Sequence, residues 1–207
     1  MKHAKKKPNL GNITQEWVSL IVPMAGDYSA KMTESELSRM TGIPQQSASR
    51  YLGKLATLNL INYERQGRNK VFYLDMKKQT TGLILAIVEA HKSLRFCVKN
   101  REISVIIGEI AKYCESLIVF GSYSSGSFSK DSDLDIVVLG KYNKQCIKKI
   151  KQKQTIEINE HYSGYNGFRK ALELRNTLSV EIMKNHLLFG DISKIVNIFM
   201  VAAHDRR

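Results

Sequence analysis

The segment Val119–Val138 constrains the fold of this chain more than any other stretch of the sequence. An apolar run ends in Gly121-Ser122, a turn rich in small residues follows, and two aspartates then stand one residue apart at the start of a second apolar run. Residues at positions i and i+2 of a strand point to the same side. We therefore expect Asp133 and Asp135 to present two carboxylates on one face, as a divalent metal site requires.

The Gly121-Ser122 turn has the features of a phosphate-binding site. Glycine lets the backbone come close to a phosphate, and Ser122 adds a hydroxyl beside the N–H groups of the turn. A helix expected to start near Ser124 adds the positive end of its dipole, and Ser132 is a further candidate for nucleotide binding. An unpaired acid within an apolar strand is costly, which favours a functional role for Asp133 and Asp135 over a solvated strand edge.

The positive charge of the chain is high and unevenly distributed. Its 207 residues carry a net charge of +13. Residues 1–100 hold 16 Lys and Arg against 7 Asp and Glu, whereas residues 101–207 hold 16 against 12. A basic N-terminal half suggests a polyanionic partner, nucleic acid first, although a solvated basic surface has the same composition. Residues 1–12 are expected to form a basic arm.

Apolar stretches and cysteines exclude several classes of protein. No apolar run in the sequence approaches the about 20 residues of a membrane span, and the first residues lack the apolar region of a signal peptide. Cys97, Cys114 and Cys146 are too few and too widely spaced for a disulfide framework or a C-x-x-C metal site. Because reduced thiols are usual in the cytosol, we expect a cytoplasmic protein with no membrane partner.

The first part of the chain predicts helices followed by a hairpin. A helix is expected over 13–30, and Thr33–Glu36 form a capping box at the start of a second helix. Thr41–Pro44 form a tight turn, after which a third helix runs to about Leu58. Two β-prone runs, 60–65 and 70–74, flank a turn that contains glycine and predict a hairpin.

The remainder alternates helical and strand patterns. A long helix over 79–99 is expected as a connector and as the contact in a homodimer, if one forms. The other expected elements are a helix over 101–113, strands over 116–120 and 134–139, a helix over 144–151, a strand over 155–159, helices over 165–184 and a last helix capped by Asp191.

Residues 13–76 resemble a winged helix-turn-helix domain of the kind found in many bacterial and archaeal repressors. In such domains the second helix of the turn motif enters the major groove, and the hairpin lies on phosphates or in the minor groove. The resemblance implies DNA contacts by Gln45, Gln46, Ser47, Ser49, Arg50, Arg65, Arg68 and Lys70. Winged helices also serve as protein-interaction modules, so a protein partner is the alternative.

The Gly121-Ser122 turn, followed after ten intervening residues by Asp133-x-Asp135, resembles the signature of the polymerase-β-like nucleotidyltransferases, especially their small minimal members. The resemblance extends over about residues 101–203. It implies that Gly121 and Ser122 hold the β- and γ-phosphates and that Asp133 and Asp135 bind Mg²⁺. It also implies a third carboxylate, both metal ligand and base, for which Glu157 is the first candidate and Glu160 the second.

These resemblances together predict an α+β protein. A winged helix-turn-helix domain is expected over 13–76, a connector helix over 77–100, and over 101–207 a polymerase-β-like nucleotidyltransferase α/β domain with a small mixed sheet. Two departures from the family bear on turnover. Ser125 stands where many minimal members have arginine, and Glu157 is one methylene longer than the more usual aspartate.

Three functions fit these expectations. The first is a magnesium-dependent nucleotidyltransferase that moves a nucleoside monophosphate from a nucleoside triphosphate to a protein or RNA hydroxyl, on or near DNA; some minimal members act in toxin–antitoxin pairs. The second is a transcriptional regulator whose nucleotidyltransferase-like domain binds nucleotide without turnover. The third is a small-molecule nucleotidyltransferase of the antibiotic-modifying kind, which leaves the basic N-terminal half unexplained.

Overall fold

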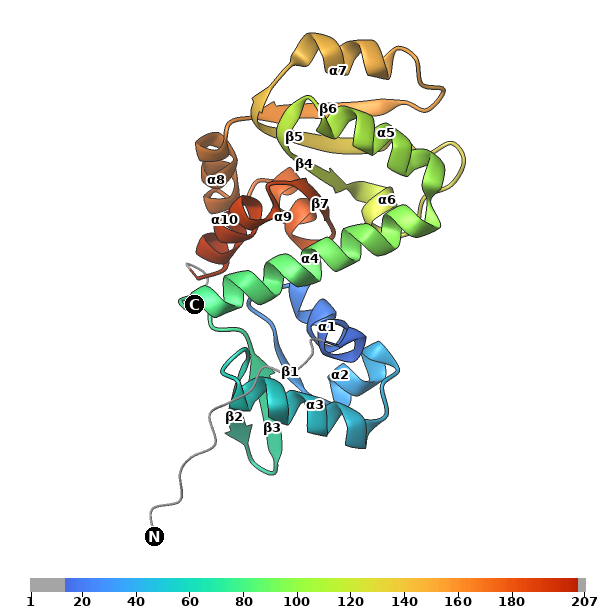
Figure 1. Cartoon of the computed structure of the whole chain (residues 1–207). Helices are drawn as coiled ribbons and strands as arrows, with labels where there is room; N and C mark the ends of the chain where they lie inside the picture. The colour runs from blue at the N-terminus through green and yellow to red at the C-terminus, as the bar shows by residue number, and fades with distance from the viewer. Residues whose placement is uncertain (1–13, 205–207) are drawn as a thin grey trace.

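The computed structural model describes residues 14–204, and the predicted basic arm lies outside this range. One long helix, α4 (Gln79–Lys99), runs between two lobes (Figure 1). The first lobe contains α1 (Gln15–Ile21), η1 (Val22–Ala25), β1 (Lys31–Thr33), α2 (Glu34–Thr41), α3 (Gln45–Thr57), β2 (Asn62–Gln66) and β3 (Asn69–Tyr73). The second contains α5 (Arg101–Ala111), β4 (Cys114–Phe120), α6 (Gly121–Ser125), β5 (Leu134–Tyr142), α7 (Lys144–Lys151), β6 (Ile158–Ser163), α8 (Tyr165–Glu173), α9 (Thr177–Lys184), β7 (Leu187–Gly190) and α10 (Ile192–His204).

The first lobe combines its helices with a three-stranded antiparallel sheet in the order β1-β3-β2. The predicted capping box is present at the start of α2. The N–H of Glu36 donates to Thr33 Oγ1 at 3.3 Å, and the N–H of Thr33 donates to the Glu36 carboxylate at 2.7 Å. The predicted hairpin is formed by β2 and β3. Both elements follow from local sequence signals, which is why the sequence predicts them well.

The first helix is shorter than the sequence predicts. The expected helix over 13–30 ends at Ile21 and continues only as the 3₁₀ segment η1 to Ala25. Pro23 lacks the N–H that α-helical hydrogen bonding needs, and its ring clashes with the preceding turn. The chain then enters β1, a strand of three residues that carries too little periodicity to be predicted from sequence.

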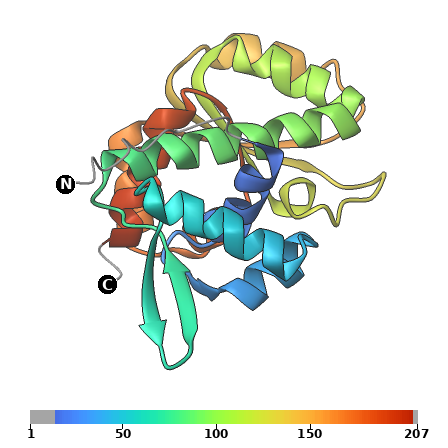
Figure 2. The ribbon, with the colours of Figure 1, turned by 60° about the horizontal axis from the view of Figure 1, so that its bottom comes forward.

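Helix α4 lies at the centre of the molecule, between the two lobes (Figures 1 and 2). A single hydrophobic cluster contains Leu52 of α3, Val88 of α4 and Phe199 of α10. The core therefore continues from one lobe to the other through this helix, so the predicted connector is also part of the hydrophobic core. Within the described residues, no helix is long and apolar enough to cross a bilayer.

The second lobe is built on a four-stranded mixed sheet in the order β6-β5-β4-β7. Strand β6 runs parallel to β5, whereas β4 is antiparallel to both β5 and β7. Ile107 of α5 and Ile147 of α7 pack on the face of the sheet that carries Ile136. Phe168 of α8 packs on the face that carries Val137. The small mixed sheet predicted for this region is confirmed.

The strand predicted over 155–159 forms at a different position, Ile158–Ser163. Residues 152–157 are turn and irregular structure, although their alternating pattern suggested a strand. The parallel partner decides the start, because β5 begins at Leu134 and Leu134 pairs with Ile158. Glu157 therefore precedes β6, and its carbonyl accepts a hydrogen bond from the N–H of Leu134 at 2.8 Å.

The three cysteines are free thiols, each partly buried. Burial raises the pKa of Cys114 to about 11, so this thiol stays protonated near neutral pH.

Candidate active site

The Gly-Ser turn lies at the junction of β4 and α6, where the chain leaves the sheet. Gly121 adopts a φ of 67°, a left-handed conformation that glycine takes without strain. A Cβ at this position would also overlap the Oδ2 atom of Asp135. Glycine is thus required for two reasons, and the second brings the turn directly against one of the predicted metal ligands.

The two aspartates lie together at the start of β5, beside the neighbouring strand β6. Asp135 pairs with Phe120 on one side and with Asn159 on the other. The Asn159 side-chain amide donates to Asp133 Oδ2 at 3.3 Å and to Asp135 Oδ1 at 3.2 Å. Asn159 therefore holds both carboxylates in one orientation from a single amide group.

Asn159 was not predicted as a site residue. It lies two positions after Glu157, so the same alternation that suggested Glu157 also places Asn159 on that side of the strand. What the sequence lacked was the register, because only the pairing of Asp135 with Asn159 shows which residue faces the aspartates. Glu157 was predicted because it is an acid, and Asn159 was not considered because its side chain is a neutral amide.

The structure does not gather a third acid around the two aspartates. Among the residues from 14 to 204, no group of three His, Cys, Asp or Glu side chains is placed to hold a metal ion. Glu157 is exposed just before β6. Glu160, the second candidate, pairs with Ile136 and forms an ion pair with Lys151 of α7 at 2.6 Å. Glu160 is thus engaged on the opposite face of the sheet from Asp135.

The turn between α6 and β5 is held by its own hydroxyl groups. Ser132 Oγ accepts a hydrogen bond from the N–H of Ser129 at 2.8 Å, which closes the turn just before Asp133. Tyr123 donates its hydroxyl to the carbonyl of Ser132 at 3.3 Å and stacks on Phe128 with centroids 4.5 Å apart. The Ser132 hydroxyl, a predicted nucleotide contact, is thus used in the structure to shape the loop.

The pKa of Tyr123 is affected by the negative charge of the site. Burial first, and then the negative charge of Asp133, raise the pKa of the Tyr123 phenol above its usual value. The hydroxyl therefore stays protonated at neutral pH and can act as a hydrogen-bond donor.

The oxygen donors of the site suit magnesium. Asp133 and Asp135 supply hard carboxylate oxygens on one face, and Mg²⁺ prefers such oxygens together with retained water and phosphate oxygens. Because two carboxylates and substrate phosphates suffice for many magnesium sites, the residues present fit a divalent cation that arrives with a nucleotide. The absence of a side chain at Gly121 lets the Asp135 carboxylate lie directly against the backbone of the turn.

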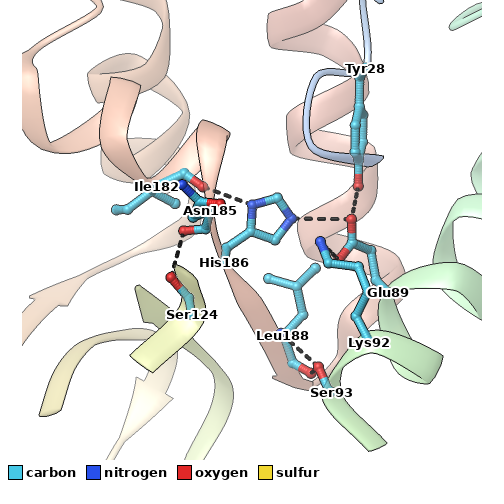
Figure 3. A network of polar contacts seen from close by, with 9 residues as sticks. All are labelled: Tyr28, Glu89, Lys92, Ser93, Ser124, Ile182, Asn185, His186 and Leu188. Atoms are coloured by element: carbon cyan, nitrogen blue, oxygen red, sulfur yellow. Dashed lines mark hydrogen bonds and ion pairs between the residues drawn. The ribbon is translucent and has the colours of Figure 1, made fainter. Parts of the chain in front are cut away.

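Polar contacts connect Ser124, just after the Gly-Ser turn, with Asn185, the neighbour of the buried His186 (Figure 3). Ser124 of α6 donates to the carbonyl of Gly121 at 2.9 Å and to the carbonyl of Asn185 at 3.1 Å. The next residue, His186, is fully buried and contacts Glu89 of α4 at 3.1 Å. The turn is therefore tied, through adjoining residues, to the helix that joins the two lobes.

The predicted DNA-contacting residues form two groups in the first lobe. Four side chains on one side of α3 are exposed and, together with Glu34, line a shallow hollow: Gln45, Gln46, Ser49 and Arg50. Ser47 is half-buried. The second group, Arg65, Arg68 and Lys70, is exposed around the tip of the β2–β3 hairpin.

Two side chains of the α3 group, Gln45 and Arg50, have defined neighbours. The Gln45 amide donates to Ser35 Oγ at 3.3 Å, which joins the starts of α2 and α3. The Arg50 guanidinium lies 5.1 Å from the centroid of the Tyr51 ring. Both the α3 group and the hairpin group lie on exposed surfaces of the first lobe. Asp133 and Asp135 belong to the second lobe.

Comparison with known families supports the second lobe. Residues 101–187 match the family model of the nucleotidyltransferase domain, which confirms this part of the resemblance. The matched segment contains Gly121, Asp133, Asp135 and Asn159, and the family points to the transfer of nucleotidyl groups. Neither the curated proteins nor the solved structures gave a match to this chain.

Proposed function

We propose that this protein is a magnesium-dependent nucleotidyltransferase that moves a nucleoside monophosphate from a nucleoside triphosphate to a hydroxyl of a protein or an RNA. One observation carries the proposal. Asp133 and Asp135 share the Asn159 amide, at 3.3 and 3.2 Å, immediately beside the left-handed Gly121. Two aligned carboxylates next to an open backbone turn form a site in which a metal-bound polyphosphate can lie.

In the proposed reaction, the acceptor oxygen forms a bond to the α-phosphorus while the bond from that phosphorus to the bridging oxygen of the β-phosphate breaks. Pyrophosphate leaves, and a base takes the hydroxyl proton. Magnesium, when bound, supplies the positive charge that offsets the charge of the polyphosphate. Asp133 and Asp135 hold the cation, Asn159 keeps both carboxylates aligned, and Gly121 with Ser122 admits the β- and γ-phosphates.

Glu157 remains the proposed third acid and base. It lies just before β6 with its side chain exposed, and its carbonyl bonds to the residue between the two aspartates. A side chain with this freedom can turn toward an acceptor hydroxyl once substrate is bound. Ser132 is proposed only as a backbone-shaping contact of the nucleotide loop, because its hydroxyl already binds Ser129.

We further propose that the first lobe is a winged helix-turn-helix that binds DNA. The support is the order of α2, a turn at Gly42 with φ of 71°, and α3, followed by a hairpin in a β1-β3-β2 sheet. The exposed side of α3 offers Gln46 and Arg50, and the hairpin tip offers Arg65, Arg68 and Lys70. Side chains of these types contact base edges and phosphates.

Asn159 also favours a second candidate function. A neutral amide, rather than a third acid, contacts both aspartates, which weakens the negative field that draws a second cation. A site of this kind can bind a nucleotide without turning it over. The alternative is therefore a transcriptional regulator in which nucleotide binding changes the affinity of the first lobe for DNA.

One experiment distinguishes the transferase from the regulator. The protein is incubated with magnesium, labelled nucleoside triphosphates and either total RNA or cell protein, and transfer of label to each fraction is measured. We expect transfer in the intact chain and loss of at least about 100-fold in Asp133→Asn and Asp135→Asn, because each removes a charged ligand. Nucleotide binding without transfer, together with nucleotide-dependent DNA affinity, would favour the regulator instead.

A further inference from the structure

Helix α4 carries an exposed apolar stripe along one side. Leu83, Ile87, Leu94 and Val98 are 61%, 40%, 63% and 66% exposed, and the exposed Ala90 lies between them. At about 100° per residue, these five positions fall on one narrow face of the helix. The opposite face of α4 is buried in the core. Monomeric proteins seldom expose a contiguous apolar surface of this kind, so the stripe indicates an interface.

We propose that this stripe pairs with the same stripe of a second copy of the chain, with the two α4 helices antiparallel. The spacing of the stripe is self-complementary about a point between Ala90 and His91. Leu83 and Val98 lie equally far from that point, and so do Ile87 and Leu94. A two-fold interface brings one patch against itself in reverse order. Leu83 would thus meet Val98 of the partner subunit, and Ile87 would meet Leu94 of the partner subunit.

The small side chain at the centre suits the same arrangement. Ala90 lies beside the two-fold axis, where it would pack between Ala90 of the partner subunit and His91 of the partner subunit. Packed helices lie about 8–10 Å apart, and the lower end of this range needs small residues at the closest point. The larger side chains on either side of Ala90 would then pack against those of the partner subunit at both ends of the stripe.

The distribution of charge along α4 selects the antiparallel orientation. Residues 79–88 contain no charged side chain, whereas Lys92, Arg95 and Lys99 lie in the second half of the helix. Lys92 is neutralised by Glu89 at 2.8 Å, and Lys99 lines a hollow beside Tyr123 and Phe128, away from the stripe. Arg95 is exposed and borders the stripe. A parallel pair would place Arg95 beside its own copy, whereas an antiparallel pair places it beside the uncharged half.

A second copy fits the stripe better than the chain's own N-terminal segment does. Besides Met1, residues 1–13 contain only Leu10 and Ile13 as large apolar side chains, together with four lysines. Two large apolar side chains are few to match the four of the stripe, and the lysines carry the same positive charge as Arg95, which repels them. The dimer goes beyond the proposed function and does not depend on nucleotidyl transfer.

The first test is the mass of the full chain in solution, measured by sedimentation equilibrium over a range of concentrations. We expect a dimer for the intact protein and at least about a 100-fold weaker dimer for Leu94→Glu, because the two-fold axis introduces the buried charge twice. Leu174→Glu is the matched control. Leu174 is 80% exposed at the end of α8, outside the stripe, so this variant should remain a dimer.

The second test uses disulfide crosslinking and reports the orientation. Cys97→Ser, Cys114→Ser and Cys146→Ser together provide a background without native thiols. Leu83→Cys and Val98→Cys are then made separately in this background and mixed before mild oxidation. We expect a crosslinked dimer from the mixture and little from either variant alone, because Cα atoms more than about 7 Å apart cannot be bridged.

Each remaining outcome overturns the proposal. A crosslink formed by Leu83→Cys alone would show a parallel pair and contradict the proposed orientation. A monomeric intact protein would rule out the dimer. In that case, if Leu94→Glu lowered the melting temperature of the monomer more than Leu174→Glu did, the stripe would be covered by another segment of the same chain.

Discussion

Glu89 and His186 are 97 positions apart in the chain, yet the Glu89 Oε1 and His186 Nε2 atoms lie 3.1 Å apart in the core. Tyr28 donates its hydroxyl to the same carboxylate oxygen at 3.1 Å, and Lys92 donates to the other oxygen at 2.8 Å (Figure 3). The first lobe, helix α4 and the junction of α9 with β7 therefore meet at one carboxylate. This carboxylate is expected to hold the two lobes in a fixed relation.

Removal of the Glu89 carboxylate should destabilise the whole molecule. We expect Glu89→Ala to lower the free energy of unfolding by about 3–5 kcal/mol, because buried polar partners lose their shared acceptor. Glu173→Ala is the control, since Glu173 forms an exposed pair with Arg169 at 3.5 Å and such pairs contribute about 0–1 kcal/mol. Urea unfolding measures both changes. Equal losses in the two variants would contradict the role given to Glu89.

The same network makes stability depend on pH. Burial raises the pKa of Glu89, but the charge and hydrogen bonds of His186 and Lys92 outweigh burial and leave the pKa below its usual value. The unfolded chain then binds the proton at a higher pH than the folded chain does. The contribution of Glu89 is therefore present above about pH 4.3 and is lost as pH falls through the lower folded pKa.

The pH dependence is measured as a difference between two proteins. The melting temperatures of the intact chain and of Glu89→Gln are compared from about pH 6 to about pH 3, which spans the titration of a glutamate. We expect the gap between them to narrow as the pH falls, because protonation makes Glu89 resemble glutamine. A gap that stays constant over this range would show that the charge of Glu89 contributes nothing.

Gly121 and Gly126 offer a matched pair for testing the nucleotide turn. Both have positive φ, 67° and 78°, but a Cβ would overlap Asp135 only at Gly121 and would meet nothing within 4 Å at Gly126. We expect Gly121→Ala to weaken magnesium-nucleotide binding at least about tenfold more than Gly126→Ala, since both carry similar backbone strain. Isothermal titration calorimetry measures the affinities. Similar affinities in both variants would mean that contact with Asp135 is unimportant.

Asn159 is expected to set the affinity of the aspartates for metal. Asn159→Asp should strengthen Mn²⁺ binding, measured by water proton relaxation, by about tenfold, because each added carboxylate raises the charge of the ligand set. Asn159→Ala should weaken it by releasing Asp133 and Asp135. Glu157→Gln belongs in the same titration, since a metal ligand at Glu157 predicts weaker binding. An unchanged affinity in Asn159→Asp would place the metal elsewhere.

The proposed DNA contacts differ in how they respond to salt. A phosphate contact by Arg68 predicts that Arg68→Ala lowers the slope of log affinity against log salt by about 0.9. Arg50→Ala, on α3, should instead reduce discrimination between DNA sequences. Lys149→Ala, a cation on α7 in the other lobe, is the control. Fluorescence anisotropy at several salt concentrations measures all three, and equal slopes would contradict the proposed docking.

Much of the candidate site was predictable because its signals are local. The Gly-Ser turn and the Asp133-x-Asp135 spacing lie within one hairpin-like segment, and β-strand alternation alone places both aspartates on one face. The capping box at Thr33 and the end of α2 at Gly42 are equally local. Predictions that rested on these neighbouring residues were therefore close to the structure, whereas the helix over 13–30 was predicted too long because Pro23 ends the α-helix.

Predictions that needed a distant partner were less accurate. The strand at 155–159 was displaced to 158–163 because the register is set by pairing with β5. That shift places Asn159, not an acid, beside Asp135. The buried role of Glu89 was not predicted. Its hydrogen-bond partners, Tyr28 and His186, are far away in the sequence, and no spacing rule connects them to Glu89.

The sequence by itself determined the glycine turn, the two neighbouring aspartates and the amphipathic elements, because residue type, spacing and periodicity act within a few residues. Tertiary structure alone decided the register of β6, the amide that holds the two aspartates, and the burial of one carboxylate between the lobes. These features depend on contacts between segments far apart in the chain. Such contacts form only when the whole core packs. They escape sequence analysis because interactions between neighbouring residues do not determine which distant segments meet.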